Sequence, residues 1–328
     1  MKIFFKLICV VLCSCYTLTA CSSVSKVINT ASSKSKLSYL VVGFDDAAEN
    51  TDVICTVSYD EEENVVRVLQ IPRDTYFDSG YSQRKINQIF SAKRSVGIDK
   101  NSALKEFSDV LADALGVQFD GYVGISISAF RNIIDAIGGV DVDIPHDVDI
   151  SDDGDSGTTV LKKGINHLDG ALSEKFVRYR QGYIMGDLSR IDAQKLFINA
   201  LFYKAKNDID LPKIIEVISI YHKDVVSNVR LHSGLDIAYA FLKNKSASVF
   251  YATMPGEPII GNNGLSFYVL NRKSSAEIVK RYLCAENEFD QQRRFMRSDD
   301  LGFINIYNDE NFKAQEFCSE NLDSIKMK

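Results

Sequence analysis

The sequence predicts an α/β fold built as a single domain. From residue 37 onward, short runs rich in Val, Ile, Leu and Tyr alternate with longer runs in which apolar residues recur at helical spacing. Chain-breaking residues stand between these runs: the polar stretch 60–64 separates two strand candidates, and glycines follow two helical runs. An alternation of this kind is typical of one α/β domain rather than several.

Five short apolar runs bounded by turn residues are the strand candidates. They are residues 37–43, 53–59, 65–71, 122–127 and 140–144. The polar stretch 60–64 predicts a hairpin between the second and the third. A further strand over 176–180 would aim Arg178 and Arg180 at one face, because alternate residues of a strand share a face.

Five longer runs with helical spacing of apolar residues are the helix candidates. They are residues 101–115, 128–137, 187–206, 212–221 and 234–242. Gly116 and Gly138, which follow the first two, predict the C-terminal ends of those helices. The charged region 285–328 has one strand-like piece at 303–307 and then a short helical pattern. We expect it to be a short C-terminal appendage that is partly disordered.

The N-terminus has the features of an export signal. Lys2 and Lys6 precede an apolar run that is too short for a membrane span of about 20 residues. The run leads into Leu-Thr-Ala-Cys, which resembles a bacterial lipobox with Cys21 as the lipid-modified residue. We therefore expect a lipoprotein signal peptide over 1–20, a Ser-rich tether over 21–36, and a lipid anchor in the outer face of the cytoplasmic membrane. An uncleaved signal anchor is the alternative, and it also leaves the domain extracytoplasmic.

The net charge, the cysteines and one acidic run indicate which partners, disulfides and metal ions to expect. The chain has a formal net charge of −6 and no Lys/Arg-rich run, so we expect no nucleic-acid partner. Cys55 lies in an apolar strand candidate, where a buried thiol is the usual state. Cys284 and Cys318 either pair, which an oxidising compartment permits, or remain thiols. The acidic run 141–157 begins like a calcium loop, but Val160 stands where a bidentate Glu should be, and we interpret the run as a solvated loop.

Three arginines lie near residues that can orient them. Arg178 and Arg180 precede a helix candidate on which Asp187, Arg190 and Gln194 share one side. Guanidinium groups bind phosphate oxygens in pairs, and a helix N-terminus adds a positive dipole, so this cluster suits a pyrophosphate or polyphosphate. Taken alone, the segment also fits a solvated face with surface ion pairs.

The ends of the first three strand candidates supply further polar groups. Asp45 and Asp52 flank one strand edge, and paired carboxylates at an anionic site suit Mg²⁺, which shares oxygen ligands with substrate phosphates. Arg73 follows the third strand, and Lys85 and Asn87 lie in the next connection. Because ligands of α/β folds gather at strand ends, we expect these residues and the arginine cluster to form one site.

Several short motifs follow one another along the chain. They are Gly43-x-Asp45, Thr51-Asp52, Ile71-Pro-Arg-Asp-Thr75, Lys85-Ile-Asn87, Arg178-x-Arg180, Asp187, Arg190 and Gln194. In this order they resemble the LytR-CpsA-Psr family, densely over 37–206 and more weakly beyond. The resemblance implies a mixed central sheet flanked by helices on both faces (α-β-α), with a catalytic domain over 37–284. It also implies an extracytoplasmic phosphotransferase that moves a glycopolymer, such as teichoic acid or capsule, from an undecaprenyl-pyrophosphate carrier to a peptidoglycan hydroxyl.

The resemblance assigns roles residue by residue. Asp45 and Asp52 correspond to magnesium-associated carboxylates, and Asp52 could also help to deprotonate the acceptor. The residues that correspond to the pyrophosphate-binding arginines and their orienting partners are Arg73, Arg178, Arg180, Asp187, Arg190 and Gln194. Lys85 and Asn87 are further substrate-binding candidates. An Arg/Mg²⁺ clamp without a covalent nucleophile is the expected chemistry, because phosphoryl transfer depends mostly on positioning and charge neutralisation. We expect an apolar groove for the polyprenyl tail beside the clamp, lined by helices of the 101–137 and 187–206 regions.

Two positions depart from the family pattern. Asn50 and Ala193 stand where the family usually has arginine. Each missing arginine would remove a charge-assisted contact worth about 1.5–3 kcal/mol. A non-catalytic scaffold that binds polyprenyl-linked phosphates, or a pyrophosphatase in which water replaces the sugar hydroxyl, is therefore an alternative. We favour the transferase because both carboxylates and four arginines are present.

Overall fold

The computed structural model describes residues 36–45, 50–80, 84–151, 159–179, 187–229, 248–261, 264–296 and 305–319. These residues all belong to one unit, Lys36–Lys328. The expected signal peptide, Cys21, nearly all of the expected tether and the helix expected at 234–242 lie outside the described residues. Within the described part, no helix is both long enough and apolar enough to cross a membrane.

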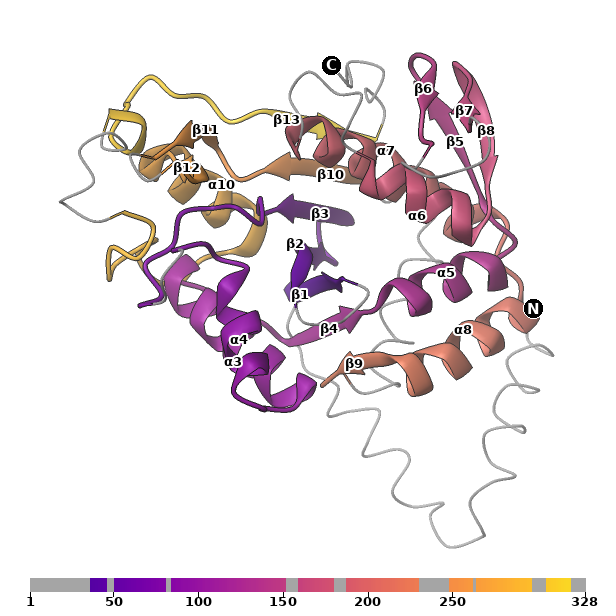
Figure 1. Cartoon of the computed structure of the whole chain (residues 1–328), viewed down its shortest axis with the longest axis horizontal. Coiled ribbons are helices and arrows are strands. Elements are labelled where there is room, and N and C mark those ends of the chain that lie inside the picture. The colour runs from indigo at the N-terminus through magenta and orange to yellow at the C-terminus, as the bar shows by residue number, and fades with distance from the viewer. Residues whose placement is uncertain are drawn as a thin grey trace, which may run out of the picture. The chain divides into compact units, whose positions relative to one another are not determined.

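A mixed sheet runs through the unit (Figure 1). Among the described residues it has seven strands in the order β13-β10-β3-β2-β1-β4-β9. Their bounds are β1 Lys36–Phe44, β2 Thr51–Asp60, β3 Val65–Gln70, β4 Gly121–Ile125, β9 Val225–Ser227, β10 Ser248–Thr253 and β13 Glu316–Cys318. β2 pairs antiparallel with both β1 and β3, while β4 and β10 run parallel to β1 and β3. The first three expected strands and the hairpin between two of them are confirmed, and the fourth strand ends earlier than expected, at Ile125.

One face of the sheet, here called the α4 face, is completely covered. Helices α3 (Gln88–Ser95), α4 (Lys100–Leu115) and α10 (Arg272–Leu283) pack on it. The apolar side chains that β1 directs to this face are at most 2% exposed: Leu40, Val42 and Phe44. The helix expected at 101–115 is confirmed as α4, because the Asp99 side chain caps its first turn and Gly116 ends it at a φ of 71°.

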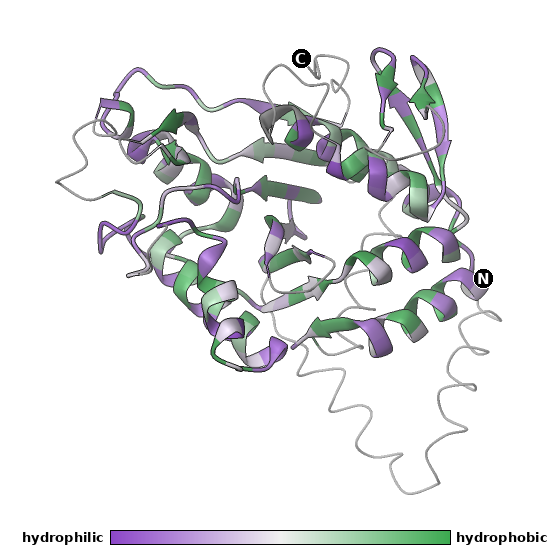
Figure 2. Ribbon diagram, viewed as in Figure 1, coloured by the Kyte–Doolittle hydropathy of each residue, from purple (hydrophilic) through white to green (hydrophobic). Residues whose placement is uncertain are grey.

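The opposite face, here called the α7 face, packs in part against helix α7 (Asp187–Asn207). Residues from β2, β3 and β10 form a buried cluster there: Cys55, Tyr59, Val66, Val68, Val249 and Tyr251. Burial raises the pKa of the Cys55 thiol to about 12, in agreement with a buried, unreactive cysteine. Helices on both faces confirm the α-β-α architecture, and Figure 2 shows hydrophobic central strands beside amphipathic helices.

A third core lies among helices beside the sheet. It is surrounded by α5 (Ile127–Ala136), α6 (Gly170–Arg178), α7, α8 (Leu211–Asp224), β5 (Val140–Ile144), β6 (Val148–Asp149), β7 (Val160–Leu161) and β8 (Gly164–Leu168). The helices expected at 128–137, 187–206 and 212–221 are thus confirmed. The strand expected at 140–144 forms as β5, but it pairs with β8 instead of joining the central sheet. One more hairpin, β11 (Gly256–Ile260) with β12 (Ser266–Leu270), follows β10.

Two expectations of strand structure are wrong. Residues 176–178 form the last turn of α6, whose N-cap Asp169 accepts a hydrogen bond from the Leu172 amide. Phe176 is fully buried on the core side of this helix, so packing and capping outweigh the alternating pattern that suggested a strand. Residues 305–307 are helical rather than extended, and residues 303–304 lie outside the described part.

The C-terminal region belongs to the main fold instead of forming an appendage. Phe289, Phe295 and Tyr307 are buried in the core of the α4 face, and β13 is an edge strand of the central sheet. The boundary expected after Cys284 therefore does not separate two units. Cys284 itself is exposed and carries a free thiol, so a disulfide to Cys318 is not formed.

Lys195 is a buried lysine on α7, and its charge makes folding less favourable. It is 5% exposed, its Nζ lies 3.0 Å from an Asp192 oxygen, and burial lowers its pKa below the usual 10.5 although Asp192 acts in the opposite direction. Because the folded state disfavours the charged form, stability rises with pH between the lowered folded pKa and the unfolded value. We expect Lys195→Met to raise the free energy of unfolding by about 1 kcal/mol at neutral pH.

Urea titrations of both proteins at several pH values would test this expectation. The stabilisation should shrink as the pH approaches 10.5, where the unfolded lysine also loses its proton. A variant that is less stable than the parent at neutral pH would instead show that the Lys195–Asp192 pair contributes net stability.

Candidate active site

Asp52 occupies a β-bulge between β1 and β2. Gly43 pairs with Val53 and Phe44 pairs with Thr51, so Asp52 is the additional residue between them. A bulge turns the side chain of the additional residue out of the regular alternation of the strand. The Asp52 carboxylate forms an ion pair with the Arg73 guanidinium, and the two side chains are 20% and 22% exposed. The pair is therefore shielded from bulk solvent yet still reachable by a substrate.

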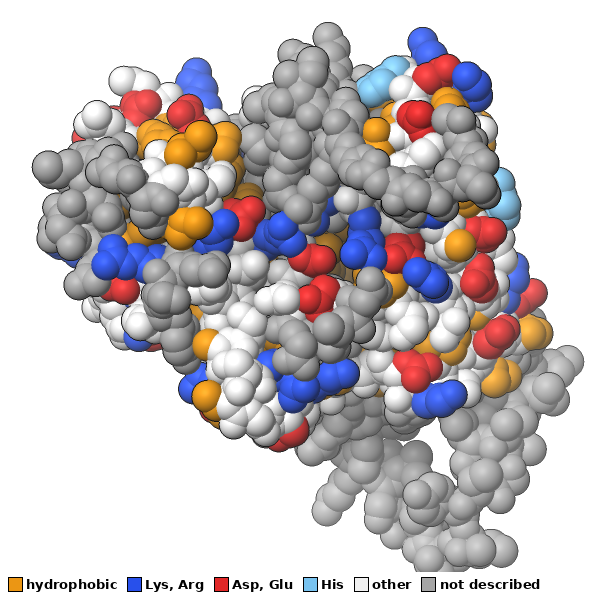
Figure 3. All heavy atoms as spheres, viewed as in Figure 1, with side chains coloured by type: hydrophobic (Ala, Val, Ile, Leu, Met, Phe, Trp, Pro, Cys, Tyr) orange, Lys and Arg blue, Asp and Glu red, His pale blue; other side chains and the backbone are white. Residues whose placement is uncertain are grey.

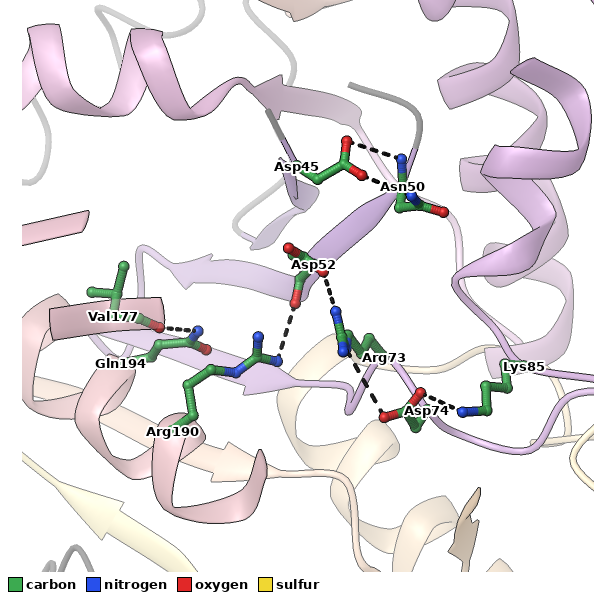
Figure 4. Close-up of polar contacts among 9 residues, drawn as sticks. All are labelled: Asp45, Asn50, Asp52, Arg73, Asp74, Lys85, Val177, Arg190 and Gln194. Carbon is green, nitrogen blue, oxygen red and sulfur yellow. Dashed lines mark hydrogen bonds and ion pairs between the residues drawn. The ribbon is translucent and has the colours of Figure 1, made fainter. Parts of the chain in front are cut away.

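Asp45 lies beside this bulge, directly after β1. Its carboxylate accepts hydrogen bonds from the Asn50 side-chain nitrogen at 2.7 Å and from the Asn50 amide at 3.3 Å. The Asp45 amide donates in return to the Asn50 carbonyl oxygen at 3.1 Å. These bonds hold together the two ends of the β1–β2 connection, so Asp45 and Asp52 lie at the same end of the sheet, as expected (Figure 4).

Arg73 begins the connection that follows β3, and this connection folds back on itself. Its Asp74 carboxylate accepts a hydrogen bond from Lys85 Nζ at 2.8 Å and lies 3.9 Å from Arg73 Nε. The Asn87 amide donates to the Arg73 carbonyl oxygen at 3.4 Å. Asn87 therefore lies beside Arg73 and Lys85, as expected from the sequence. Arg73 Nε and Asn87 Oδ1 are buried, and neither makes a hydrogen bond within the described part of the chain. Two buried polar atoms of this kind favour a polar ligand at this point.

Helix α7 brings the second half of the site to the sheet. Arg190 is 3% exposed and donates from Nη2 to the Asp52 carbonyl oxygen at 3.3 Å. Gln194, one turn later, donates to the Val177 carbonyl oxygen at 3.0 Å and accepts a hydrogen bond from the Gln70 side chain. The shared helix side expected for Arg190 and Gln194 is confirmed, and Arg73 and Arg190 both contact Asp52 (Figure 4).

Arg178 lies on a helix instead of the expected strand. Arg178 lies in the last turn of α6, and its Nη1 donates to Glu174 at 2.7 Å. The same carboxylate pairs with Arg131 of α5, which links the two helices. Arg180 lies outside the described residues, and Asp187 begins α7 but its side chain is not described.

Sequence reasoning missed three polar residues of the site. Gln70 ties the end of β3 to Gln194, Glu174 orients Arg178, and Thr51 is fully buried with an Oγ1 that makes no hydrogen bond among the described residues. Thr51 stands inside a quoted motif and Gln70 directly precedes one, so their position was the only available signal. Glu174 precedes Arg178 by one helical turn, and that signal required α6 to be recognised as a helix.

Charged side chains gather in one band over this part of the molecule. Figure 3 shows basic and acidic side chains alternating across the middle of the viewed face. The site's own ion pairs follow the same alternation, with Asp52 paired to Arg73 and Asp74 between Arg73 and Lys85. Each carboxylate keeps an arginine or lysine oriented, so the cations are already in position for an anionic ligand.

An incompletely covered apolar surface adjoins the charged residues. The side chains that β1 and β4 direct to the α7 face are partly exposed, unlike those on the α4 face: Leu37, Tyr39, Val41, Val123 and Ile125. The expected apolar lining therefore comes from the strands as well as from helices. Helix α4, which we included in that lining, packs on the opposite face of the sheet, so that part of the expectation is wrong.

The carboxylates are compatible with a magnesium ion shared with a substrate. No group of three or more His, Cys, Asp or Glu side chains that could hold a metal occurs among the described residues. Mg²⁺ at phosphate-transfer sites is commonly held by one or two carboxylates together with substrate phosphates and water. Asp45 and Asp52 at one end of the sheet supply such a pair, so the donor set fits.

These features define a class of protein: an α/β domain with arginines and carboxylates at the strand ends of a mixed sheet, next to an exposed part of its apolar face. The LytR_cpsA_psr family model matches residues 16–282. The chain therefore belongs to the LytR-CpsA-Psr family, as the order of its motifs indicates.

Relatives by sequence carry transferase names. The chain is 26% identical over 260 residues to the polyisoprenyl-teichoic acid–peptidoglycan teichoic acid transferase TagV of Bacillus subtilis (strain 168), over 76% of this chain. The match spans 64% of the length of TagV. TagU of Bacillus anthracis (strain CDC 684 / NRRL 3495), which has the same transferase description, is 25% identical over 263 residues, or 78% of this chain and 81% of TagU.

Solved structures agree with the fold. The crystal structure of B. subtilis TagV has a TM-score of 0.62 at 25% identity and covers 77% of this chain and 99% of the TagV chain. A structure of TagT bound to LIIa-WTA has a TM-score of 0.60 at 21% identity, over 76% of this chain and 92% of TagT. The second likeness supports the fold alone.

Proposed function

We propose that this protein is an extracytoplasmic glycopolymer transferase. In this proposal it moves a glycopolymer from an undecaprenyl-pyrophosphate carrier to a hydroxyl of peptidoglycan. The observation that carries the proposal is the convergence of Arg73 and Arg190 on Asp52 at a bulge next to a partly exposed apolar sheet face. A pyrophosphate joined to a polyprenyl chain has the matching chemistry, with an anionic head and an apolar tail. The names of TagV and TagU support the same class of reaction.

The charged residues neutralise the pyrophosphate in this proposal. Arg73, Arg178, Arg180 and Arg190 bind its oxygens, Lys85 and Asn87 contact the same group, and Asp187 and Gln194 orient the arginines. The acceptor hydroxyl attacks the sugar-proximal phosphorus, the bridging P–O bond breaks, and undecaprenyl phosphate leaves. Asp52 accepts the hydroxyl proton after the substrate has taken over its contact with Arg73. Preorganised cations stabilise the charge that develops on the leaving phosphate.

Magnesium belongs to this proposal as the cofactor. Asp45 and Asp52 would hold Mg²⁺ together with the phosphates of the donor. The ion would supply further neutralisation of the pyrophosphate charge.

The location of the protein is also part of the proposal. A lipid on Cys21 would hold the domain at the outer face of the cytoplasmic membrane, where both the carrier lipid and peptidoglycan are within reach. The 14 residues between Cys21 and Lys36 span at most about 50 Å when fully extended.

A transfer assay tests the proposal. The unit Lys36–Lys328 is incubated with a synthetic polyprenyl-pyrophosphate oligosaccharide, peptidoglycan and Mg²⁺, and we expect the oligosaccharide on peptidoglycan and free polyprenyl phosphate. Asp52→Asn should abolish transfer, whereas Asp109→Asn, at an exposed ion pair with Lys105, should not change it. EDTA should stop the reaction. Binding without any product would favour a scaffold, and soluble oligosaccharide phosphate without transfer would favour a pyrophosphatase.

A further inference from the structure

The C-terminal segment 285–319 lies beyond the family match, which ends at residue 282. The described parts of this segment are 285–296 and 305–319. Its first part is held by Asp290, which is 1% exposed and has a left-handed φ of 52°. The Asp290 amide donates to the Ala114 carbonyl oxygen at 2.9 Å, and its carboxylate accepts bonds from the Phe295 amide and the Tyr307 hydroxyl. This part is therefore a well-defined turn packed on the end of α4.

The turn packs against the connection that carries Arg73. Phe295, which is fully buried, meets the Phe77 ring edge-on with centroids 5.1 Å apart, and it stacks on Phe289 at 5.3 Å. The Asp78 amide donates to the Arg294 carbonyl oxygen at 2.6 Å. Residues of the C-terminal segment thus hold Phe77 in position.

Backbone hydrogen bonds connect Phe77 to the candidate site. The Phe77 amide donates to the Arg84 carbonyl oxygen at 2.9 Å, and Tyr76 is bridged to Lys85. The Ile86 amide donates to the Thr75 carbonyl oxygen at 2.9 Å. Residues 75–77 therefore pair with residues 84–86, and this pairing holds Arg73, Lys85 and Asn87 close together.

The other end of the segment reaches α7. β13 pairs antiparallel with β10, with Phe317 opposite Tyr251. Lys195 Nζ lies 4.8 Å from the centre of the Phe317 ring. Lys195 follows Gln194 directly and stands five residues after Arg190 on the same helix. The C-terminal segment thus touches both the Arg73 connection and the helix that carries Arg190.

We propose that the segment 285–319 is a brace that sets the positions of the two halves of the candidate site, with Phe295 and Phe317 as positioning residues. Phe295 holds the connection with Arg73 and Lys85, and Phe317 supports α7 with Arg190 and Gln194. Both arginines contact Asp52, Arg73 through its carboxylate and Arg190 through its carbonyl oxygen, so a shift of either half separates them. The catalytic consequence rests on the proposed function, whereas the positioning itself does not.

Hydrogen exchange of the free protein tests the positioning. Phe295→Leu and Phe317→Ala are compared with Phe312→Ala, a half-buried phenylalanine of the same segment near α10. We expect faster amide exchange in 73–87 for Phe295→Leu and in 187–195 for Phe317→Ala, with parental exchange in both regions for the control. Unchanged exchange in both regions for both brace variants would overturn the proposal. The milder Phe295→Leu is used because an alanine at this fully buried position could unfold the protein.

Donor kinetics of the same variants test the consequence. We expect each brace variant to lose about tenfold in kcat/KM for the polyprenyl-pyrophosphate oligosaccharide, because a displacement of about 1 Å at a reacting group has a large effect on rate. The thermal midpoint of each variant is recorded, and Phe312→Ala should keep parental kcat/KM even if its midpoint falls. Parental kcat/KM in both brace variants would overturn the proposed consequence. A parent protein without turnover would contradict the proposed function, while the exchange result would still decide the brace.

Discussion

Replacement of Arg73 by alanine is expected to lower the rate of transfer by about 10²–10³-fold, because one preorganised donor at a site of developing charge is worth that much. Arg73 has several connections within the site. It pairs with Asp52, lies near Asp74, and has a buried Nε that makes no hydrogen bond among the described residues. The variant would also leave the Asp52 carboxylate without its cation. Transfer rate and donor binding are measured together, so that a loss of binding is separated from a loss of turnover.

A matched arginine provides the control for this experiment. Arg272→Ala removes a guanidinium that is 44% exposed and pairs with Glu288 at 2.8 Å, at the start of α10. Its effect on transfer should be less than about twofold, because exposed ion pairs contribute little. Arg73→Lys keeps one positive charge but not the two-pronged geometry, and we expect it to recover only part of the rate. If the Arg73→Ala variant transfers at the parental rate, binding of the pyrophosphate by Arg73 does not contribute to catalysis.

Ala193→Arg is expected to lower the free energy of unfolding by several kcal/mol, although it would restore a residue that the family usually has. Ala193 is fully buried among the apolar side chains of the third core, including Phe176 and Phe197. An arginine there must displace packed side chains and lose its hydration without a carboxylate partner. Thermal and urea unfolding measure the loss. A variant of parental stability would show that the guanidinium reaches the site.

Asn50→Arg is the contrasting substitution. Asn50 is exposed, and among the described residues its side chain donates a hydrogen bond to Asp45. We expect parental stability within about 0.5 kcal/mol, because the position is exposed and an arginine can replace the contact with the Asp45 carboxylate by a surface ion pair. The added cation next to Asp45 should raise affinity for a polyprenyl pyrophosphate, measured by equilibrium binding. The two departures from the family pattern are therefore physically unequal, since only position 50 has room for an arginine.

Much of the fold could be predicted because local signals and tertiary packing agree there. Asp99 and Gly116 mark the ends of α4, and alternating apolar residues mark β1 to β3. The prediction was wrong where packing outweighed the local pattern. Phe176 draws residues 176–178 into a helix, and the charged C-terminal region is held in the main core by Phe289 and Phe295. Local periodicity reveals neither outcome. The helix at 176–178 depends on packing in the third core, and the burial of the C-terminal region depends on partners more than 100 residues away in the sequence.

Local patterns in the chain were enough to predict the class of fold, the family and most members of the candidate site, because strand-end carboxylates and arginines follow one another in a set order. How these side chains meet depends on long-range contacts. The bulge that turns Asp52 toward Arg73 depends on the register of two strands, and the tie between Gln70 and Gln194 joins a strand to a distant helix. The burial of Ala193 likewise depends on which side of α7 faces the third core. Register, helix rotation and long-range packing are set by the energy of the whole fold, and no local spacing encodes them.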